Sequence, residues 1–187
     1  MKYNNCLESF LFKASRGLLS RLRITVYRLL GLKIGKKNRL EYGRIRRSDQ
    51  IVIGIDNAFT EGFQLWPEDS DFSGIRIEIG NHNYFNKNIM LDACGKIEIG
   101  NYNMFGPDIY ITDSNHTFGE GVSPQSSPMQ RGKVKIGNHC WIGAKAIILK
   151  DVELGDYCVV AAGAVVTKSF PKGSIIAGVP ARKIKDA

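Results

Sequence analysis

Three histidines, His82, His116 and His139, are the side chains of this sequence best suited to proton transfer at neutral pH. An imidazole titrates near neutrality and can take a proton from an alcohol or an amine. His116 lies in ITDSNHTF, where a strand-like segment gives way to a stretch rich in Gly, Ser and Pro, whereas His82 and His139 lie in the short turns GNHN and GNHC. We therefore take His116 as the candidate general base. The alternative is a surface histidine that makes a single hydrogen bond.

The four cysteines, Cys6, Cys94, Cys140 and Cys158, do not indicate nucleophilic or metal chemistry. They form no CxxC pair and no dense framework, and none lies in a recognisable Cys-His arrangement. We expect buried, reduced thiols, and a covalent acyl-cysteine route is disfavoured.

A period of six residues predicts the elements that must position His116. Aliphatic residues recur at every sixth position from Ile136 to Val160, a spacing that neither the helical period of 3.6 nor the strand period of 2 explains. Triplets at the same spacing begin at Ile53, Ile79 and Ile99. Six aliphatic-Gly pairs mark the repeat, at 34–35, 53–54, 79–80, 99–100, 136–137 and 154–155.

A coil of three short strands and three corners fits this spacing, with aliphatic side chains inside and Gly, Asn, Asp or Ala at the corners. One coil cannot bury its own interior, but coils stacked about 4.8 Å apart pair their backbones and close an aliphatic column. The period is broken in residues 66–74, 87–100 and 114–133. Because the last segment is rich in Gly, Ser and Pro, we expect it to leave the stack as a loop, where function tends to lie.

This repeat resembles that of the hexapeptide-repeat family over residues 34 to 184. The resemblance implies a mainly β fold, a left-handed parallel β-helix of about six coils with a protruding loop. The left hand comes from the resemblance and runs against the usual crossover preference. We divide the chain into an N-terminal basic amphipathic arm, residues 1–33, and a β-helical acyltransferase domain, residues 34–187.

Acetyltransferases of this family, of the galactoside, maltose and xenobiotic type, carry a catalytic histidine where the wall meets a loop, one coil before a WIG motif. Here WIG is Trp141-Ile142-Gly143. The resemblance implies that His116 takes the proton of an acceptor hydroxyl while the oxygen attacks the thioester carbonyl of acetyl-CoA. It also implies that the backbone N–H of Ala144 stabilises the tetrahedral oxyanion.

The C-terminal segment VVAAGAVVTKSFPKGSIIAGVPARKIK strongly resembles the end of these enzymes that binds coenzyme A. Small residues let the backbone approach a slender pantetheine arm, and cations suit its phosphate end. The alternative is that small residues only fit tight corners and that the cations are solvated. The resemblance implies cofactor binding by Gly143, Ala144, Ala161, Ala162, Thr167, Lys168, Val179, Pro180 and Arg182.

On the acceptor side, FNKNIMLD resembles a family segment whose Asn and Asp bind sugar hydroxyls, which makes Asn86 and Asp92 candidates. Trp141 is either an apolar wall beside the thioester or the sugar, or plain surface packing. A rival resemblance is to β-helical carbonic anhydrases, which hold zinc with three histidines, two of them a few residues apart. Here the histidines are 34 and 23 residues apart, and no metal is expected.

Basic residues concentrate at the N-terminus. Residues 1–47 hold 13 Lys and Arg against Glu8 and Glu41, and the remaining 140 residues have a balance of −3, so the body carries no nucleic-acid signature. Residues 7–32 predict an amphipathic helix that either lies on an anionic membrane surface or packs on the β-helix or a sister subunit. Its residues at helical spacing are Leu18, Leu19, Leu22, Val26, Leu29 and Leu30, interleaved with Arg16, Arg21, Arg23 and Arg28.

No apolar run is long enough to predict a transmembrane helix, and Glu8 and Lys13 interrupt any signal peptide. We expect a cytoplasmic protein, with peripheral contact at the inner face of the membrane through residues 1–33 left open. The predicted function is acetyl-CoA-dependent O-acetylation of a sugar hydroxyl in cell-surface polysaccharide biosynthesis, by a homotrimer whose saccharide acceptor is free or linked to a nucleotide or a lipid. An amino-sugar N-acetyltransferase and a non-catalytic β-helical scaffold are the alternatives.

Overall fold

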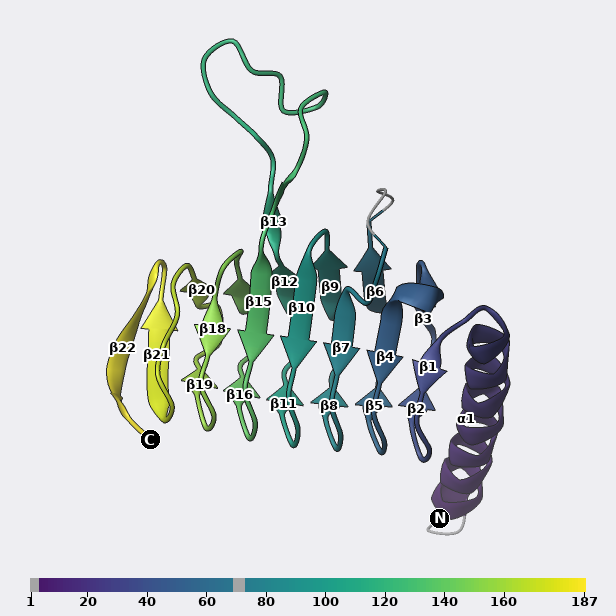
Figure 1. Cartoon of the computed structure of the whole chain (residues 1–187). Coiled ribbons are helices and arrows are strands. Elements are labelled where there is room, and N and C mark those ends of the chain that lie inside the picture. Colours follow the sequence, from purple (N-terminus) through teal and green to yellow (C-terminus); the bar gives the residue numbers. More distant parts are fainter. Residues whose placement is uncertain (1–3, 69–72) are drawn as a thin grey trace.

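The computed structural model describes residues 4–68 and 73–187, with side chains described from residue 17 onward. The helix α1 (Asn4–Leu29) precedes short strands that stack into three parallel sheets (Figure 1). Sheet A contains β1 (Lys33–Ile34), β4 (Ile51–Ile53), β7 (Ile77–Ile79), β10 (Lys96–Ile99), β15 (Lys133–Ile136) and β18 (Glu153–Leu154).

Sheets B and C complete each coil. Sheet B contains β2 (Arg39–Leu40), β5 (Ala58–Phe59), β8 (Tyr84–Phe85), β11 (Met104–Phe105), β16 (Trp141–Ile142), β19 (Val159–Val160), β21 (Ser174–Gly178) and the antiparallel β22 (Ala181–Asp186). Sheet C contains β3 (Gly43–Ile45), β6 (Phe63–Pro67), β9 (Met90–Ala93), β12 (Tyr110–Thr112), β17 (Ile147–Ile148) and β20 (Val165–Val166). A short 3-10 turn, η1 (Ser48–Gln50), precedes β4.

The coils wind with a left hand, which confirms the predicted fold. In Figure 1 the strands of sheet A run downward at the front, the chain returns upward behind them, and successive coils advance from right to left. Each of six coils gives one strand to each of the three sheets. The prism therefore has three corners, which we name A–B, B–C and C–A after the sheets that meet there.

The register of the sheets confirms the period of six. Ile53, Ile79, Ile99, Ile136 and Leu154 are aligned in sheet A, and the residues six and twelve positions later are aligned in sheets B and C. All fifteen side chains are at most 3% exposed, so they form one interior column. Fully burying one such side chain contributes about 1.5–3 kcal/mol.

Two kinds of stack reinforce this column. The rings of Phe59, Phe85 and Phe105 lie parallel inside the prism, with centroids 4.3 and 4.6 Å apart. At the A–B corner, the side-chain oxygen of each of Asn38, Asn57, Asn83 and Asn103 accepts the backbone N–H of its counterpart in the next coil. Cys140 and Cys158 continue the asparagine column as buried thiols; Cys94 is likewise buried and free, and the side chain of Cys6 lies outside the described ones.

The outer side of the A–B corner carries His82 and His139. Their rings stack on those of Tyr102 and Tyr157, with centroids 4.7 to 5.1 Å apart, in the order His82, Tyr102, His139, Tyr157. His82 also contacts Asp56, with Nδ1 3.0 Å from Oδ2. These two histidines are thus corner residues on the third and fifth coils, remote from the loop that carries His116.

The largest break in the repeat is a long protrusion from the C–A corner (Figure 1). Its base is an antiparallel ribbon of β13 (Ser114–Asn115) and β14 (Gln130–Arg131), and residues 116–129 form the loop beyond, as predicted. The break at 87–100 is smaller than expected, since β9 and β10 lie within it and only the turn at Cys94–Gly95 is extra. The break at 66–74 starts after Pro67, and its residues 69–72 lie outside the described ones.

The helix α1 covers the first coil with one face. Ser20 accepts the backbone N–H of Leu40 at 2.8 Å, Arg23 donates to the carbonyl oxygen of Leu40 at 2.6 Å, and Ile24 is buried in the core. The apolar residues predicted to form one face of the helix, against a membrane, the β-helix or a sister subunit, all lie exposed in the single chain, from 47% for Val26 to 84% for Leu29. The six are Leu18, Leu19, Leu22, Val26, Leu29 and Leu30.

Candidate active site

The B–C corner carries the small residues that the sequence assigned to cofactor binding. Asn86, Gly106, Gly143 and Ala161 occupy equivalent positions in four successive coils, and each donates its backbone N–H to the coil that follows. A Cβ atom added at Gly106 would lie 2.6 Å from the backbone nitrogen of Ala144, which is too close for a real contact. Gly106 and Gly143 are therefore required by coil spacing, whatever they bind, although Asn86 and Ala161 carry side chains at equivalent positions.

Ala144 and Ala162 follow Gly143 and Ala161 on the outer side of this corner. Neither backbone N–H has a hydrogen-bond partner within residues 4–68 and 73–187, and neither side chain is buried. A backbone N–H that the fold leaves unpaired can donate to a ligand carbonyl or to an oxyanion. The corner thus presents two unpaired donors on adjacent coils.

His116 stands on the protruding loop, just beyond β13, and is exposed. Its Nδ1 lies 3.2 Å from the carbonyl oxygen of Pro124 across the loop. A carbonyl oxygen can only accept, so in a neutral ring Nδ1 carries the hydrogen and donates it to this oxygen. The other nitrogen, Nε2, is then available to take a proton from a substrate.

A buried polar cluster holds the base of this loop. Asp113, one residue before β13, has no exposed surface and accepts the backbone N–H of Cys94 at 2.7 Å and of Gly95 at 3.0 Å. Arg76 is equally buried and donates to the carbonyl oxygens of Glu68 and Ala93. Sequence reasoning missed this cluster; the signal available was a charged residue beside the last buried strand before the loop.

Asp113 should make stability depend on pH. Burial raises the pKa of Asp113 to about 6, although the two N–H donors act to lower it. Because this is above the ordinary aspartate pKa, the folded state binds the proton more tightly than the unfolded chain does. The stability that the protonated carboxyl gives to the folded state is therefore complete below pH 4 and is lost as pH rises through 6. The difference amounts to about 3 kcal/mol at neutral pH.

Urea unfolding of wild type and Asp113→Asn across pH 4 to 7 measures this effect. Wild type should lose more stability than the variant over that range. Asp108→Asn, at an exposed corner, is the matched control and should follow wild type. Parallel pH profiles for wild type and Asp113→Asn would contradict the assignment.

The predicted acceptor residues lie apart from one another. Asn86 is at the B–C corner, where its Oδ1 accepts the backbone N–H of Lys87 at 2.9 Å. Asp92 lies on the outer face of sheet C and accepts the hydroxyl of Tyr110 at 2.7 Å; burial, together with this bond, raises the pKa of Tyr110 to about 12. Trp141 is 57% exposed on the outer face of sheet B, two residues before Gly143.

The remaining cofactor candidates divide between two places. Val179 and Pro180 form the turn between β21 and β22, and because β21 pairs with β19 this turn lies beside the B–C corner. Arg182 follows in β22 and is exposed. Thr167 and Lys168 follow β20, so they lie exposed at the C–A corner of the last coil.

Within one chain the structure therefore separates His116, the candidate base, from the part of the B–C corner that carries Ala144 and Ala162, which we call the wall. The loop of His116 joins sheet C to sheet A and leaves from the C–A corner. Ala144 lies between β16 and β17, at the B–C corner, together with Asn86, Gly143, Ala161 and Ala162. Sheet C lies between the two groups.

Comparison with known proteins supports the repeat directly. Residues 133–168 match the family "Bacterial transferase hexapeptide (six repeats)". This segment of the chain is a hexapeptide repeat. Nodulation protein L of Rhizobium meliloti is 40% identical over 110 residues, which are 58% of this chain and 59% of that protein, so the match spans about three fifths of this relative's length.

Two solved structures share the fold of this chain. A maltose O-acetyltransferase from Clostridium difficile superposes with a TM-score of 0.59 at 26% identity, covering 88% of this chain and 74% of the other. AntD, an N-acyltransferase from Bacillus cereus in complex with dTDP and 3-hydroxybutyryl-CoA, gives 0.73 at 23% identity and covers 85% of both chains. At that identity AntD shows a shared fold alone.

Proposed function

We propose that this protein is an acetyl-CoA-dependent acyltransferase that acetylates a sugar hydroxyl in cell-surface polysaccharide biosynthesis. The observation that carries the proposal is the hydrogen bond from Nδ1 of His116 to the carbonyl oxygen of Pro124. This bond leaves Nε2 available at the start of the protruding loop. The unpaired N–H of Ala144, directly after the WIG motif, supplies the complementary donor. The similar maltose O-acetyltransferase supports the reaction class.

The proposed reaction is direct transfer. Nε2 of His116 takes the proton of the acceptor hydroxyl as its oxygen attacks the thioester carbonyl carbon. The carbonyl oxygen becomes an oxyanion that accepts the N–H of Ala144. When the tetrahedral species collapses, the carbon–sulfur bond breaks and the coenzyme A sulfur takes the proton back from His116. Ala162, one coil further along, donates its N–H to a pantetheine amide.

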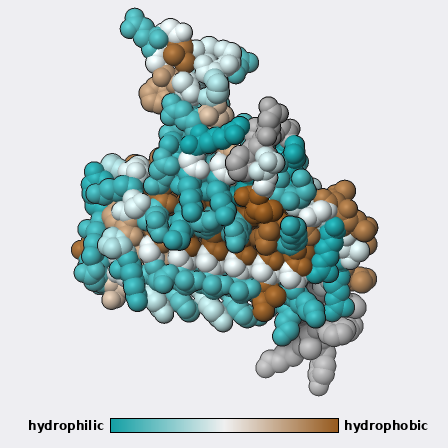
Figure 2. Space-filling model, viewed as in Figure 1, coloured by the Kyte–Doolittle hydropathy of each residue, from teal (hydrophilic) through white to brown (hydrophobic). Residues whose placement is uncertain are grey.

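We propose that a homotrimer assembles the site. Base and wall lie at different corners of one prism, so a neighbouring subunit brings them together. The outer faces of sheets B and C suit such contacts, since their outward residues include Met104, Trp141, Val159 and Ile175 on B and Met90, Ile147 and Val165 on C. Sheet A instead carries ion pairs and faces solvent; hydrophilic side chains cross this face in Figure 2.

Thiol release from acetyl-CoA, measured across a panel of acceptors, tests the proposed function. The panel contains nucleotide sugars, free saccharides, amino sugars and lipid-linked oligosaccharides. Saturating turnover with hydroxyl-only acceptors supports O-acetylation. Turnover with amino sugars alone would replace it by N-acetylation with His116 in the same role, and no turnover together with no binding of coenzyme A would leave a scaffold.

We also propose that α1 lays its exposed apolar residues on an anionic membrane surface at the inner leaflet, where lipid-linked acceptors are met. The six residues are exposed, and the basic Arg21, Lys36 and Lys37 line a groove on the same helix and the first coil. This combination of leucines and cations suits the interface of an anionic bilayer. None of the helices described in residues 4–68 and 73–187 is long and apolar enough to cross a membrane.

Leu22→Ser combined with Leu29→Ser should weaken binding of the full chain to phosphatidylglycerol vesicles by tenfold or more, since each leucine contributes about 1.5–3 kcal/mol when buried. Vesicle binding of wild type should also weaken with salt. Acetyl transfer to a soluble acceptor should be unaffected. If the variant instead loses its oligomeric state, the exposed face packs on a sister subunit and the membrane proposal is wrong.

A further inference from the structure

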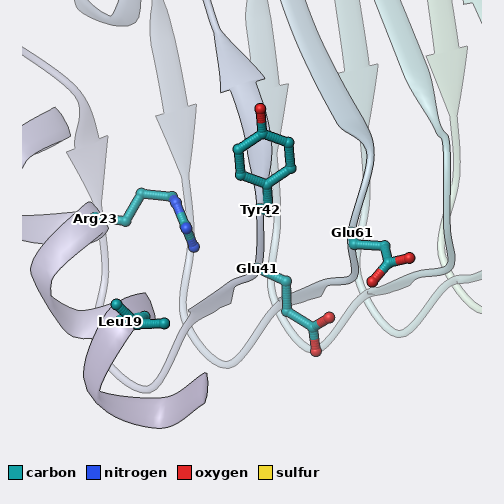
Figure 3. A pocket seen from close by; sticks show the side chains of 5 residues that line it. All are labelled: Leu19, Arg23, Glu41, Tyr42 and Glu61. Carbon is teal, nitrogen blue, oxygen red and sulfur yellow. The ribbon is translucent and has the colours of Figure 1, made fainter. Parts of the chain in front are cut away.

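A pocket lies between α1 and the first two coils, at the N-terminal end of the B–C corner (Figure 3). Its volume is about 140 Å³, and it is lined by Leu19, Arg23, Glu41, Tyr42 and Glu61. No residue predicted from the sequence to bind a cofactor or an acceptor lines it. The pocket exists only because the helix covers the first coil.

The lining suits a neutral ligand rich in hydroxyl groups. Carboxylates accept hydrogen bonds from hydroxyls, and Arg23, held through its bond to the Leu40 carbonyl, can donate. Tyr42, which is 72% exposed, offers an aromatic face to the C–H groups of a sugar ring. Glu41 and Glu61 together disfavour a phosphate or another anion at the same place.

Both carboxylates of the pocket have a basic neighbour, which holds them in place. Glu41 is largely buried, and its carboxylate lies 3.7 Å from Arg39, while Glu61 pairs with Lys87 at 3.1 Å.

The pocket and the proposed transfer site lie along the same corner. Backbone hydrogen bonds place Glu61, Lys87, Pro107 and Ala144 at equivalent positions of the second to fifth coils. Three coil spacings separate Glu61 from Ala144, which is roughly 14 Å at the usual strand separation. That distance exceeds the length of a single sugar ring.

We propose that this pocket is a distal subsite for an oligosaccharide acceptor. The subsite holds a sugar unit remote from the one that is acetylated, and Asn86 and Lys87 lie between the two ends. The inference rests on the proposed acyl transfer to a sugar and names its substrate class as an oligosaccharide in place of a monosaccharide.

Two acceptor pairs test the subsite, glucose against maltotetraose and N-acetylglucosamine against chitotetraose. In the thiol-release assay, wild type should show a KM at least tenfold lower for a tetrasaccharide than for its monosaccharide. Glu61→Gln and Tyr42→Ala should each remove that advantage while kcat/KM for the monosaccharide stays unchanged. Glu78→Gln and Tyr102→Ala, similarly exposed and remote from the pocket, are matched controls and should retain it.

Calorimetric titration of the tetrasaccharides separates the two proposals. Loss of tetrasaccharide binding in Glu61→Gln and Tyr42→Ala, even if wild type transfers no acetyl group, would keep the subsite and reject the acyltransferase. Equal KM values for long and short acceptors in wild type, or variants that affect both acceptors alike, would overturn the subsite and leave the acyltransferase standing.

Discussion

Replacing His116 by alanine should lower kcat by about 10² to 10⁴ while leaving the affinity for acetyl-CoA nearly unchanged. A general base acts chiefly on the transition state, so its removal lowers kcat and leaves ground-state binding unchanged. The bond from Nδ1 to the Pro124 carbonyl makes the prediction sharper, because it fixes which nitrogen accepts the proton. Thiol release from acetyl-CoA measures kcat, and calorimetric titration with coenzyme A measures the affinity.

His82→Asn is the matched control for this variant. His82 is a corner residue with a φ of 58°, a conformation that asparagine tolerates well, and it lies on another corner from the loop. It should keep wild-type turnover. If His116→Ala retains more than about a tenth of wild-type turnover, His116 is not the base.

Two inactive variants should restore activity to each other when they share a trimer. His116→Ala lacks the base, and Ala162→Trp fills the outer side of the B–C corner where the pantetheine arm would lie. Because His116 and Ala162 lie at different corners of one prism, each cleft should take the histidine of one subunit and the wall of its neighbour. A mixed trimer then contains clefts in which both parts are intact.

The expected recovery of activity follows from the mixing ratio. With random mixing of equal amounts, a cleft has an intact histidine half of the time and an intact wall half of the time, so about one quarter of wild-type activity should return. Each variant refolded alone should stay inactive. Refolding His116→Ala with the double variant His116→Ala/Ala162→Trp is the control, since no intact histidine is present. An absence of recovery in trimers of verified mixed composition would place the whole site within one chain.

The sequence by itself determined the architecture of the prism. A period of six is a local property, and stacking translates it directly into a position in space: Ile136, Ile142 and Ile148 fall on sheets A, B and C because each side is six residues long. The same logic made the segment after Ser114 leave the wall. Motif resemblance then supplied roles for His116 and Ala144, since these positions are defined by their distance from the WIG motif.

Only the tertiary structure decided which of these residues can meet. It placed His116 and Ala144 at different corners, although both follow buried strands in the sequence. It turned Leu22 and Leu29 outward, because Ser20 and Ile24 proved to be the residues that fit the first coil.

The buried cluster and the distal pocket depend on contacts that no local pattern encodes. Asp113 meets Cys94 and Gly95 only through stacking of coils 18 and 19 residues apart in the chain. The pocket forms where Arg23 and Tyr42 come together as α1 closes the end of the prism. Periodicity sets how each residue faces its own coil, whereas burial of a charge and closure of a cavity depend on which surfaces pack together, and that is a property of the whole fold.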